Sequence, residues 1–473
     1  MNNLSIELIE TEAKKRLGVE VAEIFRENTT SWNKVMSILI SEFTPESDAL
    51  AKGSTVIKYS SIEDQKIKDK LCALMNCVQK YDKNILKDIF EDLKQNDQLK
   101  YLYSLGNPLV KAIVNGQGQH APLLIEYGVK DYTYSNTEGS PNSTSDPYLE
   151  LDCVEGRSAL FYAVLYGNIG LVEFLLKKGA RSDLNFLNGK KKQSLIAVLV
   201  DSVPQKIEQR RKFILCLFLL LKGLKNSEKS EMIKNASLKI AILKEHIDIA
   251  NLLYAMGARI TSREQLDLKS IVINSFKKNN IKLIEFLHQR SIVDLKTLRV
   301  GSGATLLHEA LSYGAEEILD YLIKIGVPKD IKNEFGETYE VSGKKALREN
   351  TIFYLKEFYI NRRRSVEIPF FWYGKIYEIC KKYHIDLNES INGKNQSFLH
   401  VAAASYLDSC SSDNSHCIEA LLECGLKVNQ RDAGGNTPLD IARTTLHNAK
   451  WYNEKSRQIA LKNIQLLESK LNL

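Results

Sequence analysis

The sequence predicts an all-α solenoid, in which helix pairs stack one after another along the chain. A first observation is self-similarity, because G-G-N-T-P-L-D-I-A at 434–442 and S-F-L-H-V-A-A at 397–403 are copies of one motif. A second is that fainter copies recur back to Asn107, the best of them at a period of about 33 residues. A third is that 44% of the 473 residues are hydrophobic, which supplies a long buried core. A repeat unit of this kind buries its apolar face only against a neighbouring unit.

Each copy predicts two antiparallel helices. Small Ala residues in the first helix let the helices approach closely, and Leu, Ile and Val stripes seal each unit against the next. A Gly after the second helix supplies a left-handed cap. The clearest copies span 158–180, 235–258 and 305–326, and the weaker ones span 107–128, 193–223, 268–287, 338–358, 397–429 and 437–471.

Three of the weaker copies and one separate segment depart from the pattern. The copy at 193–223 has an insertion, V-P-Q-K-I-E-Q-R-R, between its helices, and the copy at 268–287 has Asn274 where Ala is usual. In the copy at 338–358, N-T-I-F-Y-L-K-E-F is predicted to form the second helix. The segment 374–388 is typical of a second helix, but no first helix precedes it.

The T-P-L-H-x-A opening, the I-V-x-L-L second helix and the following G-A-D-V-N resemble ankyrin repeats over roughly residues 105–471. The resemblance implies an ankyrin-repeat solenoid in which hairpin fingers join successive helix pairs. It also implies binding of a protein partner on the concave surface of first helices and finger tips. In this family the His of T-P-L-H, here His308 and His400, braces the finger by hydrogen bonds.

Four regions follow from these patterns. Residues 1–104 do not repeat, and their periodic apolar positions predict an N-terminal α-helical domain. Residues 105–359 are ankyrin repeats, some of them degenerate, and 360–373 interrupt the array. Residues 374–473 are C-terminal repeats that end in a cap, whose longer polar second helix suits contact with solvent.

Composition and charge favour a cytoplasmic protein without a membrane span. The net charge of +7 is spread over the whole chain, so it is no nucleic-acid footprint by itself. The eight cysteines follow no framework spacing, which is typical of reduced thiols in an intracellular protein. The most apolar run, 213–221, is about half a membrane span and is predicted to be a buried helix.

The sequence favours a non-enzymatic function, with no catalytic residue, metal site or cofactor assigned. Phosphate-binding loops, dinucleotide fingerprints, nucleophile elbows and zinc-protease motifs are all missing. The seven-residue spacing of Cys410, Cys417 and Cys424 puts them on one helix face and favours core packing over zinc. The alternative is an enzyme or pseudoenzyme, cysteine-dependent and hydrolase-like, in the non-repeat regions. A Cys or Ser within reach of a His in a cleft would favour it.

The partner-binding candidates are basic and aromatic. The run N-R-R-R-S-V-E-I-P-F-F-W-Y stands where a first helix is expected, and its aromatic residues either fill the core or anchor a partner. A second basic run lies at a predicted finger tip and, with Arg210, Arg211 and Lys212, suits an acidic partner or a nucleic acid. The candidates are Arg362, Arg363, Arg364, Phe371, Trp372, Tyr373, Lys190, Lys191 and Lys192.

Three residues are candidates for modification. Ser365 follows three arginines, as in basophilic kinase sites, and a phosphate there would alter the availability of those arginines. Asn388 and Asn429 occupy the finger position that asparaginyl hydroxylases modify in many ankyrin proteins, and both match the surrounding pattern in part.

The Lys-, Asn- and Ile-rich composition and degenerate repeats resemble the ankyrin effectors that intracellular bacteria such as Legionella inject into host cells. The resemblance implies secretion into the host cytosol or nucleus and a host protein as partner.

Overall fold

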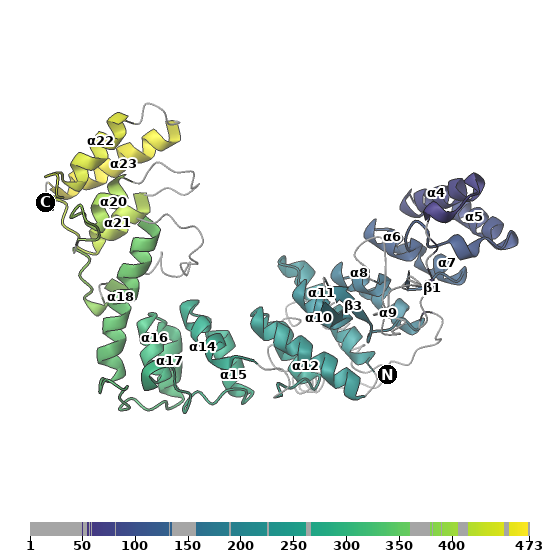
Figure 1. Cartoon of the computed structure of the whole chain (residues 1–473), viewed down its shortest axis with the longest axis horizontal. Coiled ribbons are helices and arrows are strands. Elements are labelled where there is room, and N and C mark those ends of the chain that lie inside the picture. Colours follow the sequence, from purple (N-terminus) through teal and green to yellow (C-terminus); the bar gives the residue numbers. More distant parts are fainter. Residues whose placement is uncertain are drawn as a thin grey trace, which may run out of the picture. The chain divides into compact units, whose positions relative to one another are not determined.

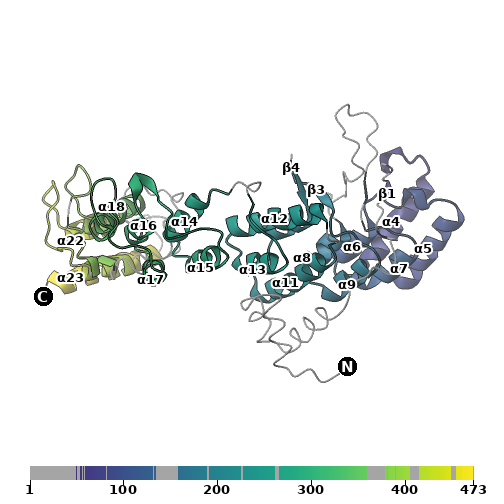
Figure 2. The ribbon, with the colours of Figure 1, turned by 90° about the horizontal axis from the view of Figure 1, so that it is seen from below.

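The computed structural model describes residues 50, 54–55, 57, 59–80, 82–131, 133–134, 158–188, 191–224, 227–261, 266–359, 379–380, 382–388, 390–404, 415–448 and 454–471. The chain divides into two units, Met1–Leu266 and Asp267–Leu473. The described elements are helices apart from two small sheets, which confirms the predicted all-α class. In Figures 1 and 2 the helices within each unit follow one another as pairs.

The first unit contains ten described α-helices. They are α4 (Gln65–Lys80), α5 (Lys83–Gln95), α6 (Pro108–Val114), α7 (Ala121–Glu126), α8 (Ala159–Leu165), α9 (Ile169–Lys177), α10 (Leu195–Asp201), α11 (Ile207–Lys222), α12 (Glu228–Leu243) and α13 (Ile247–Ala255). Strands β1 (Ser54–Thr55) and β2 (Thr133–Tyr134) pair in parallel, whereas β3 (Asn185–Asn188) and β4 (Lys191–Ser194) form an antiparallel hairpin. Figure 2 shows this hairpin projecting from the helices of the first unit.

The second unit contains nine described α-helices. They are α14 (Leu268–Lys277), α15 (Ile281–Gln289), α16 (Leu306–Ser312), α17 (Glu316–Lys324), α18 (Tyr339–Tyr359), α20 (Phe398–Ala404), α21 (Ser415–Glu423), α22 (Pro438–Asn448) and α23 (Glu454–Leu471). First helices pack on first helices and second helices on second helices, as α14 does on α16 and α15 on α17 (Figure 1).

The first helices share a buried small residue and a turn four residues later. Ala163 and Ala310 are fully buried, and Gly167 and Gly314 follow them with positive φ. In α14 the turn residue is Asn279, with a φ of 49°, so the small position belongs to Ser275, which is fully buried. The prediction that Asn274 takes the small position was wrong by one residue. The small position is set by the turn four residues later, and the sequence does not show that a non-glycine residue, Asn279, adopts the positive φ of that turn.

The helix α18 corrects a second prediction. It is one continuous helix of 21 residues, so N-T-I-F-Y-L-K-E-F is not a separate second helix. Gly343 takes the small position, where an added Cβ would lie 2.9 Å from Cβ of Leu311 in α16. Four residues later the chain has Leu347 instead of a turn glycine, and this side chain is fully buried. Without a residue that adopts positive φ readily, the helix continues.

The missing second helix of this repeat lies after the interruption. Residues 379–380 and 382–383 are helical, and Ile379 packs with Leu347 over Gly314. Lys382 forms an ion pair of 2.9 Å with Glu316 in the first turn of α17. Residues 379–380 and 382–383 therefore lie beside α17 as a second helix does, and α18 is the first helix of their repeat. The predicted interruption, 360–373, falls between the two in the chain and outside the described residues.

The insertion predicted at 203–211 is also partly helical. Residues 207–211 form the first turns of α11, where Arg210 makes a two-pronged ion pair with Asp248 of α13 (2.5 and 2.6 Å). Arg210 is therefore committed to packing between two repeats. The apolar run 213–221 is fully buried within α11, which confirms that it is a core helix.

The described helices α4 and α5, within the predicted N-terminal domain, pack on each other, and α4 also packs on α6. The predicted boundary at residue 104 stays a prediction.

Candidate interaction surface

Three fingers of the second unit end in the same side-chain-capped turn. Asn333 Oδ1 accepts hydrogen bonds from the backbone N–H groups of Phe335 and Glu337, both at 3.0 Å. The same two bonds recur at Asn392 and Asp432. An Asn or Asp side chain that caps its own turn in this way holds the backbone of the tip in one conformation.

Neighbouring fingers are joined in a fixed register. Glu334 N–H donates to Ser302 C=O at 2.9 Å, and Ala433 N–H donates to Lys394 C=O at 2.8 Å. In both pairs, the second residue of one turn donates to the residue of the preceding finger that lies three residues before Thr305 or Ser397. We call residues 301–303, 333–336, 392–395 and 432–435 the finger row.

Histidines brace the base of the fingers. His308 Nδ1 lies 3.1 Å from the backbone N of Thr305 and 2.8 Å from its Oγ1, and Nε2 lies 3.3 Å from Glu337 C=O. Because Nδ1 accepts from an N–H, Nε2 carries the proton and donates to the carbonyl. His400 repeats this arrangement with Ser397 and Asn436. The predicted bracing role is confirmed, and burial lowers the pKa of both histidines.

The Ser397–His400 pair does not favour the hydrolase hypothesis. Ser397 Oγ is 2.8 Å from His400 Nδ1, yet the exposed fractions of the two residues are 1% and 0%. A nucleophile must reach its substrate, and this one is sealed in the repeat core. The same pair recurs as Thr305 and His308, so it is a helix cap.

The tips of the finger row carry side chains that do not pack into the fold. Phe335 is 74% exposed, the largest exposed fraction among the described large apolar residues. Lys394 occupies the same turn position on the next described finger and is also exposed. The backbones of both residues are fixed by the turn bonds, so the side chains point outward from a rigid support.

The first helices of the second unit add a charged surface. Burial raises the pKa of the Glu309 carboxyl in α16, and the charges of Lys277 and Lys269 in α14 act in the opposite direction. The ammonium of Lys277 also lies 5.7 Å from the ring centroid of Tyr313. These contacts join the exposed faces of α14 and α16 into one polar and aromatic surface.

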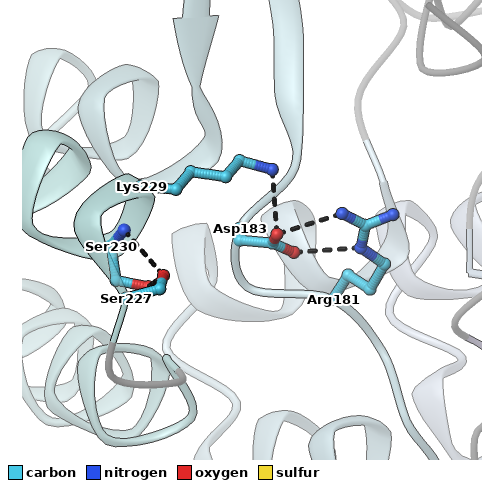
Figure 3. Close-up of polar contacts among 5 residues, drawn as sticks. All are labelled: Arg181, Asp183, Ser227, Lys229 and Ser230. Atoms are coloured by element: carbon cyan, nitrogen blue, oxygen red, sulfur yellow. Dashed lines mark hydrogen bonds and ion pairs between the residues drawn. The ribbon is translucent and has the colours of Figure 1, made fainter.

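In the first unit, Asp183 ties the base of the β3–β4 hairpin to α12 (Figure 3). Arg181 donates to both carboxylate oxygens at 2.9 and 3.0 Å, and Lys229 donates to one of them at 2.9 Å. Burial alone would raise the pKa of Asp183, but the two cations outweigh it and bring the pKa to about 2. Beside this cluster, Ser227 caps α12 by accepting from Ser230 N–H at 3.2 Å.

Most of the predicted partner-binding residues fall outside the described residues. The residues between α18 and residue 379 in the chain include Arg362, Arg363, Arg364, Phe371, Trp372 and Tyr373, as well as the modification candidate Ser365. Lys190 is likewise outside, whereas Lys191 and Lys192 begin β4 at the tip of the hairpin. Their roles in binding stay predictions.

The two candidate asparagines differ in their surroundings. Asn388 Nδ2 donates to Asp386 Oδ1 at 2.9 Å and Gly425 C=O at 3.4 Å, and its Oδ1 accepts from Lys427 N–H at 2.8 Å. This side chain therefore links consecutive finger bases. Asn429 is exposed, so its amide is the more accessible of the two.

Two cysteines of the second unit differ in burial. Cys380 is buried, and Cys424, directly after α21, is half-buried. Within the described part of the chain, no group of His, Cys, Asp or Glu has the arrangement of a metal site.

The comparisons with known proteins agree with this architecture. A family model for ankyrin repeats matches residues 35–186 in three copies. The matched range begins inside the segment 1–104. No curated protein matches the chain. Among solved structures, the human ASB11 ankyrin repeat domain is similar at 17% identity, over 65% of this chain and 98% of that one, with a TM-score of 0.26. A likeness at that score supports no argument about function.

The fold is thus an all-α solenoid of stacked helix pairs, and the family match identifies ankyrin repeats, units that serve protein–protein interaction, within residues 35–186. Among the described helices, none combines the length and apolarity needed to cross a bilayer.

Proposed function

We propose that this chain is a non-catalytic scaffold that binds a protein partner on the finger row and adjoining first helices of its second unit. The observation that carries the proposal is the exposed Phe335 on a turn whose backbone is fixed by Asn333. Aromatic side chains dominate binding energy at protein interfaces. A rigid support reduces the entropy lost when a partner binds.

We propose the interrupting segment 360–373 as a second contact point, through Arg362–Arg364 and the aromatic residues Phe371, Trp372 and Tyr373. These side chain types dominate the binding energy of protein interfaces.

We further infer that the partner is a host protein and that the chain is an effector secreted into the host cytosol or nucleus. Its composition and degenerate repeats support this proposal. Expression of the tagged chain in host cells, followed by proximity labelling, tests it. Labelling of a single host protein supports the proposal, and uniform background labelling contradicts it.

The finger row is tested by comparing Phe335→Ser with Phe353→Ser. Both residues are exposed phenylalanines of the second unit, at 74% and 53%, but Phe353 lies far along α18. Removing an interface anchor costs about 2 kcal/mol or more, which is a 30-fold or greater loss of affinity. We expect Phe335→Ser to lose the captured partner at unchanged thermal stability, with Phe353→Ser as the matched control. Equal capture by both variants would exclude the finger row.

A further inference from the structure

The second helix α11 is apolar and buried around its whole circumference. Residues 213–221 contain no charged side chain, and each of them is 2% exposed or less. Nine consecutive residues, each turned by about 100° from the last, reach every side of a helix. Among the described helices, α11 packs on α8 and α9, and Arg210 joins it to Asp248 of α13. Such neighbours cover the inner face and the flanks of a second helix, so a further element must cover the outer face of α11.

One position compares the outer faces of the second helices. It lies five residues before the C-cap, and we call it the outer position. It is Glu173 in α9, Glu285 in α15 and Asp320 in α17, each half-buried or exposed. It is Phe218 in α11 and Asn251 in α13, each 2% exposed. A carboxylate is costly to bury, so the two helices whose outer position is covered have an uncharged residue there.

The N-terminal part of the chain joins the described structure beside these helices. Leu50 is 1% exposed, and its N–H donates to the C=O of Lys178, the C-cap residue of α9, at 3.2 Å. The ends of α9 and α11 are neighbours, because a Cβ added to Gly223, the C-cap of α11, would lie 3.5 Å from Leu176 Cδ2. The segment before Leu50 therefore starts at the row of second helices.

The sequence of that segment suits an apolar surface. Its periodic apolar positions from Leu4 to Phe25 predict helix, and Leu17, Val21, Ile24 and Phe25 have the i, i+4, i+7, i+8 spacing of one helix face. A helix over residues 4–25 is roughly 33 Å long, whereas packed neighbouring helices are about 8–10 Å apart. One such helix is long enough to cross both α11 and α13.

We propose that the outer faces of α11 and α13 are a docking surface for the N-terminal segment of the same chain, residues 4–25. The apolar face of the segment packs on the run 213–221 and on the outer position of α13. Docking makes the first unit three helices deep at these two repeats, and release of the segment exposes Phe218 and its apolar neighbours. The surface belongs to the first unit, so this inference is independent of the partner proposed for the second.

The first test is cross-linking of the full-length protein with an amine-reactive reagent, followed by mass spectrometry. Lys14 and Lys15 should link to Lys212 or Lys222, which flank the apolar run 213–221. A mixture of isotope-labelled and unlabelled chains identifies the source of the segment, because links within one chain join peptides of the same isotope. Links between unlike isotopes would place the segment on a second copy. That outcome would overturn the proposal, as would links from Lys14 and Lys15 to other regions only, or none.

The second test compares Val21→Asp with Val19→Asp. The two valines are two residues apart, which is about 200° around a helix, so they lie on opposite faces of the predicted segment. A carboxylate at position 21 would be buried against apolar side chains and should release the segment, whereas one at position 19 stays in water. Hydrogen–deuterium exchange of residues 213–221 should become roughly tenfold faster in Val21→Asp and stay unchanged in Val19→Asp.

The exchange of α15 is the internal control, because its outer position is Glu285 and requires no cover. Acceleration confined to α11 and α13 supports the proposal. Equal exchange of residues 213–221 in the two variants, or equal acceleration in α15, would overturn it. If Val21→Asp does not fold, the cross-links in the wild-type chain decide.

Discussion

Two adjacent repeats of the second unit begin alike and end differently. The repeat of α16 and α17 starts at Thr305, buries Ala310 and turns at Gly314. The next repeat starts at Thr338 and buries Gly343, but it has Leu347 at the turn position and runs on to Tyr359. A single position, four residues after the small one, separates a compact repeat from one with a long helix and an insertion.

The two repeats also differ at the bracing position. His308 bonds to Thr305 and to the next finger, whereas the equivalent residue of α18 is Val341, which is 58% exposed. The interrupted repeat therefore lacks the histidine brace, and α18 contacts α16 through Gly343 and through a hydrogen bond of 2.9 Å from Asn350 Nδ2 to Ser312 C=O.

Leu347→Ala should have the largest effect on stability. Leu347 is fully buried, and its side chain packs with Ile379 against Gly314. Truncation of a buried leucine costs about 2–5 kcal/mol of unfolding free energy, because a cavity remains. Urea unfolding followed by circular dichroism measures this loss. Leu243→Ala, at a leucine that is 52% exposed in α12, is the control and should cost far less.

Gly343→Ala should destabilise the protein by about 1–3 kcal/mol, because the new methyl group would overlap Leu311 in α16. The matched control is Gly170→Ala in α9, where an added Cβ meets nothing within 4 Å. There the better helix propensity of Ala should stabilise the protein by up to about 1 kcal/mol. Opposite signs in thermal denaturation would confirm the close approach of α16 and α18. A stabilised Gly343→Ala variant would show that the two helices can separate at no cost.

His308→Val gives α16 the residue that α18 has at the equivalent position, Val341. It leaves the buried N–H of Thr305 without its acceptor, which costs about 1–3 kcal/mol at neutral pH. In the wild type, the folded pKa of His308 lies below its ordinary value of 6.5, so the unfolded state binds the proton first. The contribution of His308 to the free energy of unfolding is therefore fully present above pH 6.5. It decreases as the pH falls toward the pKa of His308 in the folded state.

The His308→Val variant should lose part of this pH dependence. The slope of its unfolding free energy against pH should be smaller by no more than about 1 kcal/mol per pH unit. Urea titrations between pH 7.5 and 5 measure the slope. His120, His246 and His400 also contribute to it, because burial lowers the pKa of each. An unchanged slope would mean that His308 is protonated as easily in the folded chain as in the unfolded one.

The strong repeats could be predicted because their determinants are local. Ser158 and Ser194 cap helices, Ala163 is small where helices meet, and Gly167 turns the chain, so each feature is visible within a few residues. The finger row is less visible, because it depends on backbone bonds between residues in different repeats. Nothing in the letters N-E-F-G indicates that Phe335 lies exposed on a turn that Asn333 holds.

The sequence by itself determined the repeat architecture, the bracing histidines and the buried run 213–221, because helix periodicity, caps and small-residue positions act over a few residues. Only the tertiary structure decided which second helix belongs to α18, since an insertion separates the two in the chain. It also decided that Arg210 pairs with Asp248 and that Asn388 bonds to the chain after α21. Such contacts between stacked repeats depend on distances in space, which the repeat period alone does not specify.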